Sequence, residues 1–142
     1  MERTLDFNQK RGFICDMDGV IYHGNRILPG VPEFIQWLHD ENKEFLFLTN
    51  NSGYTPRELQ QKLARMGLDV SEDHFYTSAL ATAAFLKEQA PGCSAFVIGE
   101  AGLFNALYDA GITMNDVNPD YVVVGEGRSY SLDTLTKATN LV

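Results

Sequence analysis

The strongest constraint on the fold is a unit of apolar strand, polar loop and amphipathic helix that occurs twice in the first half of the chain. Residues 12–15 and 45–48 are short apolar runs rich in residues that favour β-strands. Apolar residues at helical spacing follow each run, within 31–38 and 59–66. Because strands joined through helices favour a parallel sheet with crossover connections, the sequence predicts an α/β fold.

Both expected helices carry boundary signals. Pro29 and Pro32 mark the entry to the first helix. The second opens on Thr55-Pro56-Arg57-Glu58, which combines a capping box with proline at the first helical position. Gly67 supplies a stop signal.

A domain boundary is predicted at Ala90-Pro91-Gly92, because proline and glycine interrupt a helix there and a new α/β pattern follows. Before it, a third strand ends near residue 77, and Ser78 is expected to cap the next helix. We therefore predict a core at residues 1–90 and a second domain at 91–142.

Two apolar strands of the second part, 96–98 and 122–124, both run into Gly-Glu. An amphipathic helix is predicted between them around 103–108. Gly125-Glu126-Gly127 suggests a dinucleotide loop, but Tyr130 occupies the position of the third glycine. We interpret it as a turn without a cofactor.

Two carboxylates, Asp16 and Asp18, follow the first apolar strand one residue apart. Side chains alternate along a strand, so both would share one side while the strand persists, and Gly19 allows the chain to turn away. An ordinary Asp-Gly turn is the simplest alternative. An EF-hand does not fit, because Val20, Ile21 and Ile27 occupy positions that need polar residues or glycine. The spacing suggests phosphate chemistry on a metal ion.

Small polar side chains also follow the second strand, in Thr49-Asn50-Asn51-Ser52. Hydroxyl, amide and backbone N–H groups can bind phosphate oxygens without adding a competing charge. Asn and Ser are also common in strand-to-helix loops, which is the alternative for this segment alone. Together with the first motif, it favours a phosphate site at the carboxyl edge of the sheet.

Taken together, these segments resemble the haloacid dehalogenase-like (HAD) hydrolases, and within them the NagD-like, para-nitrophenylphosphatase-like branch with a large α/β cap. The resemblance runs from Asp16-x-Asp18-Gly19-Val20 through Leu48-Thr49-Asn50-Asn51 to residues 118–125. It implies a Rossmann-like parallel sheet core, of which 1–90 form the first part, followed by the start of an α/β cap at 91–142.

The resemblance also implies a magnesium-dependent phosphatase that hydrolyses a small phosphomonoester, such as a nucleotide or sugar phosphate, through an aspartyl-phosphate. Asp16 would be the nucleophile and Asp18 the acid and base. Thr49, Asn50 and Asn51 would bind the phosphoryl group. Mg²⁺ would be bound by Asp16 and by the main-chain carbonyl of Asp18, where a hard cation offsets the repulsion between two anions.

Family members carry a later lysine and a later acidic pair, and neither has a counterpart here. The lysines at 43, 62, 87 and 137 lie in contexts that do not match. Helical spacing from Leu132 to Val142 continues without a stop signal. We therefore expect about the first half of such an enzyme, inactive by itself. Two other hypotheses are a phosphotransferase of the same fold and a non-catalytic phosphate-binding or signalling module.

Composition limits the partners. Eleven Lys and Arg against nineteen Asp and Glu give a net charge of -8, which disfavours nucleic acid and anionic membranes. Cys15 and Cys93 have no metal-ligand spacing and are expected to be reduced thiols. With no membrane-length apolar run and no signal-peptide core, we expect a cytoplasmic protein that binds a small phosphorylated metabolite. An unpaired sheet edge would favour a homo-oligomer.

Overall fold

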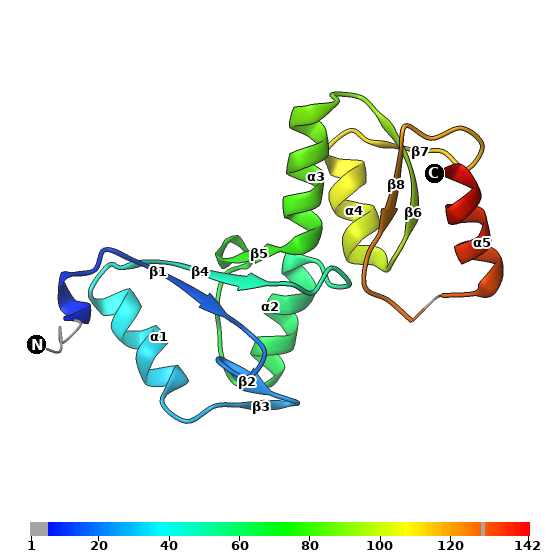
Figure 1. Ribbon diagram of the computed structural model, residues 1–142. Coiled ribbons are helices and arrows are strands. Elements are labelled where there is room, and N and C mark those ends of the chain that lie inside the picture. Colours follow the sequence, from blue (N-terminus) through cyan, green and yellow to red (C-terminus); the bar gives the residue numbers. More distant parts are fainter. Residues whose placement is uncertain (1–5, 129) are drawn as a thin grey trace, which may run out of the picture.

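Two parallel three-stranded sheets with packed helices make up the computed structural model, which describes residues 6–128 and 130–142 (Figure 1). The first sheet has the order β1-β4-β5, formed by Gly12–Asp16, Glu44–Thr49 and Phe75–Thr77. The second has the order β7-β6-β8, formed by Thr113–Met114, Ser94–Ile98 and Tyr121–Val124. The predicted α/β, Rossmann-like fold with parallel strands is confirmed.

The first sheet follows from the two strand-loop-helix units. Helix α1 (Val31–Asp40) connects the short hairpin β2-β3 (Tyr22–His23 and Arg26–Ile27) to β4, and α2 (Pro56–Arg65) lies between β4 and β5. Strands β1 and β4 pair in parallel register from Gly12 with Glu44 to Asp16 with Leu48. We call the β1-β4-β5 sheet, the β2-β3 hairpin and the helices α1 and α2 the first region.

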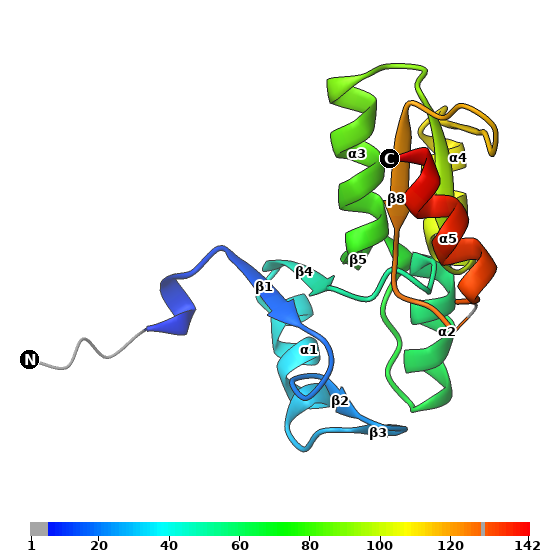
Figure 2. The ribbon, with the colours of Figure 1, turned by 45° about the vertical axis from the view of Figure 1, so that its right-hand side comes forward.

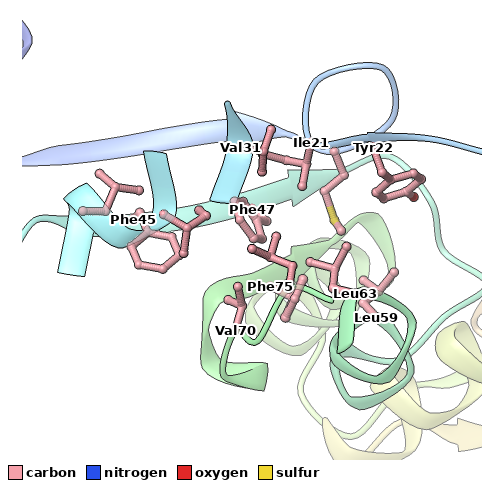
Figure 3. Packing of buried hydrophobic residues seen from close by; sticks show 13 residues of the cluster. Ile21, Tyr22, Val31, Phe45, Phe47, Leu59, Leu63, Val70 and Phe75 are labelled. Atoms are coloured by element: carbon pink, nitrogen blue, oxygen red, sulfur yellow. The ribbon is translucent and has the colours of Figure 1, made fainter. Parts of the chain in front are cut away.

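Large apolar side chains fill the core of the first region (Figure 3). Phe47 is fully buried, and its ring lies 5.6 Å from that of Phe45 and 5.5 Å from that of Phe75, measured between centroids. Leu59 and Leu63 of α2 close the cluster from the helix side. Burial of each such side chain contributes about 1.5–3 kcal/mol to folding.

The second region consists of the β7-β6-β8 sheet with α3 (Ser78–Gln89), α4 (Ala101–Asp109) and α5 (Leu132–Leu141). Figures 1 and 2 show α5 on the face of this sheet opposite α3 and α4. The alternation along β6 agrees, because Ala95 belongs to the cluster with α3 and α4 while the ring of Phe96 lies 5.5 Å from Lys137 Nζ of α5.

Hydrophobic packing divides between Phe75 and Ala79. Phe75 belongs to the first cluster, whereas Ala79, Ala83 and Leu86 of α3 belong to the second, with Leu103 and Leu107 of α4. The domain boundary predicted between residues 90 and 91 stays a prediction. In the structure, α3 packs with the residues that follow it.

The local signals agree with the helices at several points. Thr55 and Glu58 form the expected capping box, with the Glu58 N–H donating to Thr55 Oγ1 at 3.2 Å. Gly67 follows α2 in a left-handed conformation with φ of 89°. Ser78 is not the cap of α3, because the hydroxyl of Thr77 accepts the N–H of Leu80 instead. Among the described residues, no helix has the length and apolar character of a membrane span.

Candidate active site

Three strands end at the same edge of the first sheet. Asp16 is the last residue of β1, Thr49 of β4 and Thr77 of β5. The register places Asp16 beside Leu48, and Thr49 beside Thr77. Because neighbouring strands lie about 4.8 Å apart, the topology brings Asp16 close to the Thr49 loop, as the sequence predicts. In open α/β sheets this carboxyl edge is where ligands bind.

The side chains of Asp16 and Thr49 leave the sheet differently. Asp16 is exposed and pairs with exposed Leu48, whereas Thr49 is only 7% exposed and follows Phe45 and Phe47 on the core-facing side. A ligand that contacts both must therefore lie over the ends of the strands rather than on one face. Cys15 precedes Asp16, and burial raises the pKa of its thiol, so that it adds no charge near the carboxylate at neutral pH.

A tight turn sets the position of Asp18. The carbonyl of fully buried Met17 accepts the N–H groups of Val20, Ile21 and Tyr22, at 3.2, 2.9 and 3.3 Å. Gly19 has φ of 76°, which favours glycine, and its N–H donates to the Tyr22 carbonyl at 2.8 Å. Asp16 and Asp18 are both exposed while Met17 between them is buried. Both carboxylates thus lie on the solvent side of the chain, while their spacing predicted only that they would share a side.

The loop after β4 is held by its own side chains. Thr49 Oγ1 accepts the N–H of Asn51 at 3.1 Å, and Asn51 Oδ1 accepts those of Gly53 and Tyr54 at 2.8 and 3.2 Å. The Thr49 hydroxyl can still donate its hydrogen. Asn50 is exposed at the start of the loop. The structure thus gathers Thr49, Asn50 and Asn51 in one turn.

Two serines hold this loop in place: Ser52, the last residue of the predicted Thr49-Asn50-Asn51-Ser52 motif, and Ser78, which the sequence did not assign to the site. The Ser78 hydroxyl donates to the Asn50 carbonyl at 2.7 Å. Ser52 is 5% exposed, and its Oγ accepts the N–H of Glu126 at 3.0 Å. The partners lie 28 and 74 residues away in the sequence, so no local pattern could reveal either contact.

A hollow of about 590 Å³ lies next to the loop, between the first and second regions. Of the predicted site residues, Asn51 lines this hollow. Its walls also carry polar and charged side chains, namely those of Tyr54, Glu58, Glu100, Glu126 and Arg128. The hollow gives a bound ligand room beyond the strand ends.

The oxygen atoms of Asp16 and Asp18 suit a hard cation such as Mg²⁺. Within 6–128 and 130–142, no group of three or more His, Cys, Asp or Glu side chains is placed to hold a metal ion. Asp16 and Asp18 are thus two exposed carboxylates of the chemical type that this cation takes as ligands.

Comparison with known proteins agrees with this architecture. The family model for haloacid dehalogenase-like hydrolases matches residues 13–113, which include both strand-end motifs. The chain belongs to this family.

Named relatives narrow the resemblance. The chain is 47% identical over 130 residues to a dihydroxyacetone phosphatase of Corynebacterium glutamicum, covering 92% of the chain and 47% of the relative. It is 46% identical over 132 residues to the ribonucleotide monophosphatase NagD of Escherichia coli, covering 93% and 52%. These matches confirm the resemblance to the NagD-like branch.

Solved structures give the same result. NagD from E. coli superposes with a TM-score of 0.87 at 45% identity, covering 92% of the chain and 52% of NagD. A 4-nitrophenylphosphatase from Thermotoga maritima superposes with a TM-score of 0.89 at 35% identity, covering 94% and 51%. The chain therefore spans about half the length of the relatives it matches.

Proposed function

We propose that the protein, at its natural length, is a magnesium-dependent phosphatase that hydrolyses a small phosphomonoester, such as a nucleotide or sugar phosphate, through an aspartyl-phosphate. The observation that carries the proposal is the joint placement of Asp16 and the Thr49 loop at one edge of the parallel sheet. The printed names of two relatives, a dihydroxyacetone phosphatase and a ribonucleotide monophosphatase, support phosphomonoesters as the substrate class.

In the first step, a carboxylate oxygen of Asp16 attacks phosphorus, and the bond between phosphorus and the ester oxygen breaks. Asp18 gives its proton to the departing oxygen. Thr49, Asn50 and Asn51 bind the oxygens of the phosphoryl group, through the Thr49 hydroxyl and the side-chain amide N–H groups. This arrangement suits a ligand over the strand ends, where the Asp16 and Thr49 side chains can both reach it.

In the second step, Asp18 takes a proton from water, and the resulting hydroxide attacks phosphorus. The bond between phosphorus and Asp16 breaks, which restores the carboxylate and releases inorganic phosphate. A bound magnesium ion would supply charge compensation between the anionic nucleophile and the anionic phosphate. The Asp16 carboxylate and the Asp18 main-chain carbonyl are the groups of this chain that would hold it.

The hollow beside Asn51 would receive the leaving group, since Asn51 belongs to both the hollow and the proposed phosphoryl site.

We also propose that the partner is a small phosphorylated metabolite and that the enzyme is cytoplasmic. Cys15 and Cys93 are both free thiols, which suits a reducing compartment. An association into homo-oligomers through an unpaired sheet edge remains part of this proposal.

The test measures phosphate release from para-nitrophenyl phosphate, nucleotides and sugar phosphates by the protein at its natural length. Asp16→Asn is expected to lower kcat/KM by about a thousandfold or more, because it removes the nucleophile. Asp69→Asn is the matched control, since Asp69 is exposed and precedes β5, at the opposite edge of the sheet. Equal activity of the two variants would refute the proposed role of Asp16.

Three further measurements separate the steps and the competing hypotheses. Chelation followed by addition of Mg²⁺ should abolish and restore turnover. Asp18→Asn should accumulate phosphorylated protein from a substrate with a good leaving group, visible by intact mass, because hydrolysis of the intermediate then lacks its base. Transfer to an added alcohol in preference to water would indicate a phosphotransferase, and absence of any turnover would indicate a binding module.

A further inference from the structure

The loop after the proposed phosphate-binding residues is docked into the second region. Ser52 Oγ accepts the Glu126 N–H at 3.0 Å, and the Gly53 carbonyl accepts the Gly102 N–H at 3.0 Å. Glu126 follows β8, and Gly102 lies in the first turn of α4. Two separate elements of the second region therefore hold consecutive residues of one loop.

The approach is so close that Gly102 has no room for a side chain, and Gly125 has little. A Cβ atom on Gly102 would lie 2.7 Å from the backbone carbonyl oxygens of Ser52 and Tyr54. A Cβ atom on Gly125 would lie 2.9 Å from Ser52 Oγ and 2.6 Å from Leu103 Cδ2. A side chain at Gly102 would therefore displace the backbone of the loop or the helix, whereas one at Gly125 would displace the side chains of Leu103 and Ser52.

The docked residues continue directly from the phosphate-binding turn. Asn51 bonds back to Thr49 Oγ1 through its N–H and forward to Gly53 and Tyr54 through its Oδ1. A displacement of Ser52 and Gly53 would therefore move Asn51. Misplacement of binding groups by about 1 Å is enough to weaken a site strongly.

We propose that Ser52 is a positioning residue: its hydrogen bond to Glu126, beside the contact of Gly53 with Gly102, lets the second region set the geometry of the Thr49-Asn50-Asn51 loop and thereby its affinity for phosphate. This inference rests on the proposed function. It assigns to the second region a role in phosphate binding without contact with the phosphate. Ser52 acts through the loop, because its side chain is only 5% exposed and its Oγ faces the Glu126 N–H of the second region.

The test compares Ser52→Ala with Ser94→Ala in the protein at its natural length. Ser94 is the matched control, because its hydroxyl bonds to Asp120 within the second region, at 2.8 Å, and does not touch the loop. Ser52→Ala should raise KM for para-nitrophenyl phosphate and the inhibition constant of inorganic phosphate about fivefold or more, with kcat changed less than about twofold. Ser94→Ala should change each less than about twofold.

Amide hydrogen exchange supplies a readout that does not depend on turnover. Exchange at Asn51, Gly53 and Tyr54 should be about tenfold faster in Ser52→Ala than in the wild type, and unchanged in Ser94→Ala. Ser52→Thr retains a hydroxyl acceptor and should return both KM and exchange to within about twofold of the wild type. If Ser52→Ala does not fold, Ser52→Cys, with its weaker acceptor, replaces it under the same expectations.

Two results would overturn the inference. One is an effect of Ser52→Ala no larger than that of Ser94→Ala on KM and on exchange of the loop. The other is an equal defect in Ser52→Ala and Ser52→Thr, because the hydrogen bond would then not be the cause. A wild-type protein without turnover would refute the proposed function instead, and the exchange measurement would still decide the role of Ser52.

Discussion

The two regions have the same strand-helix architecture but fill their cores with different side chains. The first region packs Met17, Phe45, Phe47 and Phe75 under its sheet. The second region has leucines such as Leu103 and Leu107, and adds small residues, among them Ala79, Ala83, Ala95 and Ala106, between its sheet and helices α3 and α4.

The strand ends differ in a corresponding way. The first sheet ends in Asp16 and Thr49, which offer functional groups to a ligand. In the second sheet, glycines at 99 and 125 follow β6 and β8, and Gly125 leaves space for Ser52. The comparison indicates that the first region carries the proposed chemistry, while the second is built for close backbone approach.

The largest expected effect is the loss of a large core side chain from the first region. Phe47→Ala should lower the free energy of unfolding by about 3–5 kcal/mol, because Phe47 is fully buried between Phe45 and Phe75. Urea unfolding followed by the fluorescence of Trp37, which packs against the same cluster, measures it. Phe85→Ala, at an exposed position of α3, should change stability by less than about 0.5 kcal/mol. Equal losses would contradict the assignment of the core.

The second region should be more sensitive to added volume. Ala95→Leu is expected to cost about 1–3 kcal/mol, because Ala95 is fully buried on β6 beneath α3 and α4. Circular dichroism during urea unfolding would detect the loss. Ala64→Leu, at an exposed position of α2, is the control and should be neutral within about 0.5 kcal/mol. A stable, native-like Ala95→Leu would show that the small residues do not set the packing distance.

Loss of a helix N-cap should lower the free energy of unfolding by the same amount in both regions. This tests whether the two regions differ only in their cores. Thr55→Ala in α2 and Ser131→Ala in α5 each remove a capping box and should cost about 1 kcal/mol. Thermal unfolding of both variants, with Thr55→Ser as the conservative control, measures the pair. A difference between the two alanine variants well above 1 kcal/mol would mean that a cap also supports tertiary structure.

The smallest expected effect is a pH dependence at the surface of the second region. The hydrogen bond from Lys137 and its charge hold the pKa of Asp116 below the ordinary value of an aspartate. Because the pKa is lower in the folded state, the carboxylate contributes stability above its unfolded pKa, and this is lost as the pH falls through the folded pKa.

Asp116→Asn should therefore be less stable than the wild type at pH 7 and equal to it at strongly acid pH. Urea unfolding at both pH values measures the difference. In a Lys137→Gln background the substitution should have no pH-dependent effect, and a persistent pH dependence there would assign it to another group. Since the ion pair is exposed, the effect should be reduced by salt.

Local patterns predicted much of the first region. Strand alternation predicted that Asp16 and Asp18 would share one side, and in the structure both are exposed; the capping box at Thr55 fixed the start of α2 to the residue. Ser78 was wrongly predicted as the cap of α3, since Thr77 and Ser78 are both competent caps and the strand register decides between them.

The packing of α3 and the docking of the loop could not be predicted. Helix α3 has small apolar residues on several sides, so its sequence does not show which sheet it covers. The contact between Ser52 and Glu126 joins positions 74 residues apart, and no strand or helix period connects them. The roles of Asp16, Asp18, Thr49, Asn50 and Asn51 stay predictions, to be tested by the variants above.

The bond between Ser52 and Glu126 also bears on the order of folding. Closing a segment of 74 residues carries an entropic cost that local turns do not, so contacts of this kind tend to form late. Pulse-labelled exchange during refolding should show the α2 amides protected before those of Gly53 and Tyr54. A newly synthesised chain would then need to fold both sheets before the loop could reach the geometry proposed for phosphate binding.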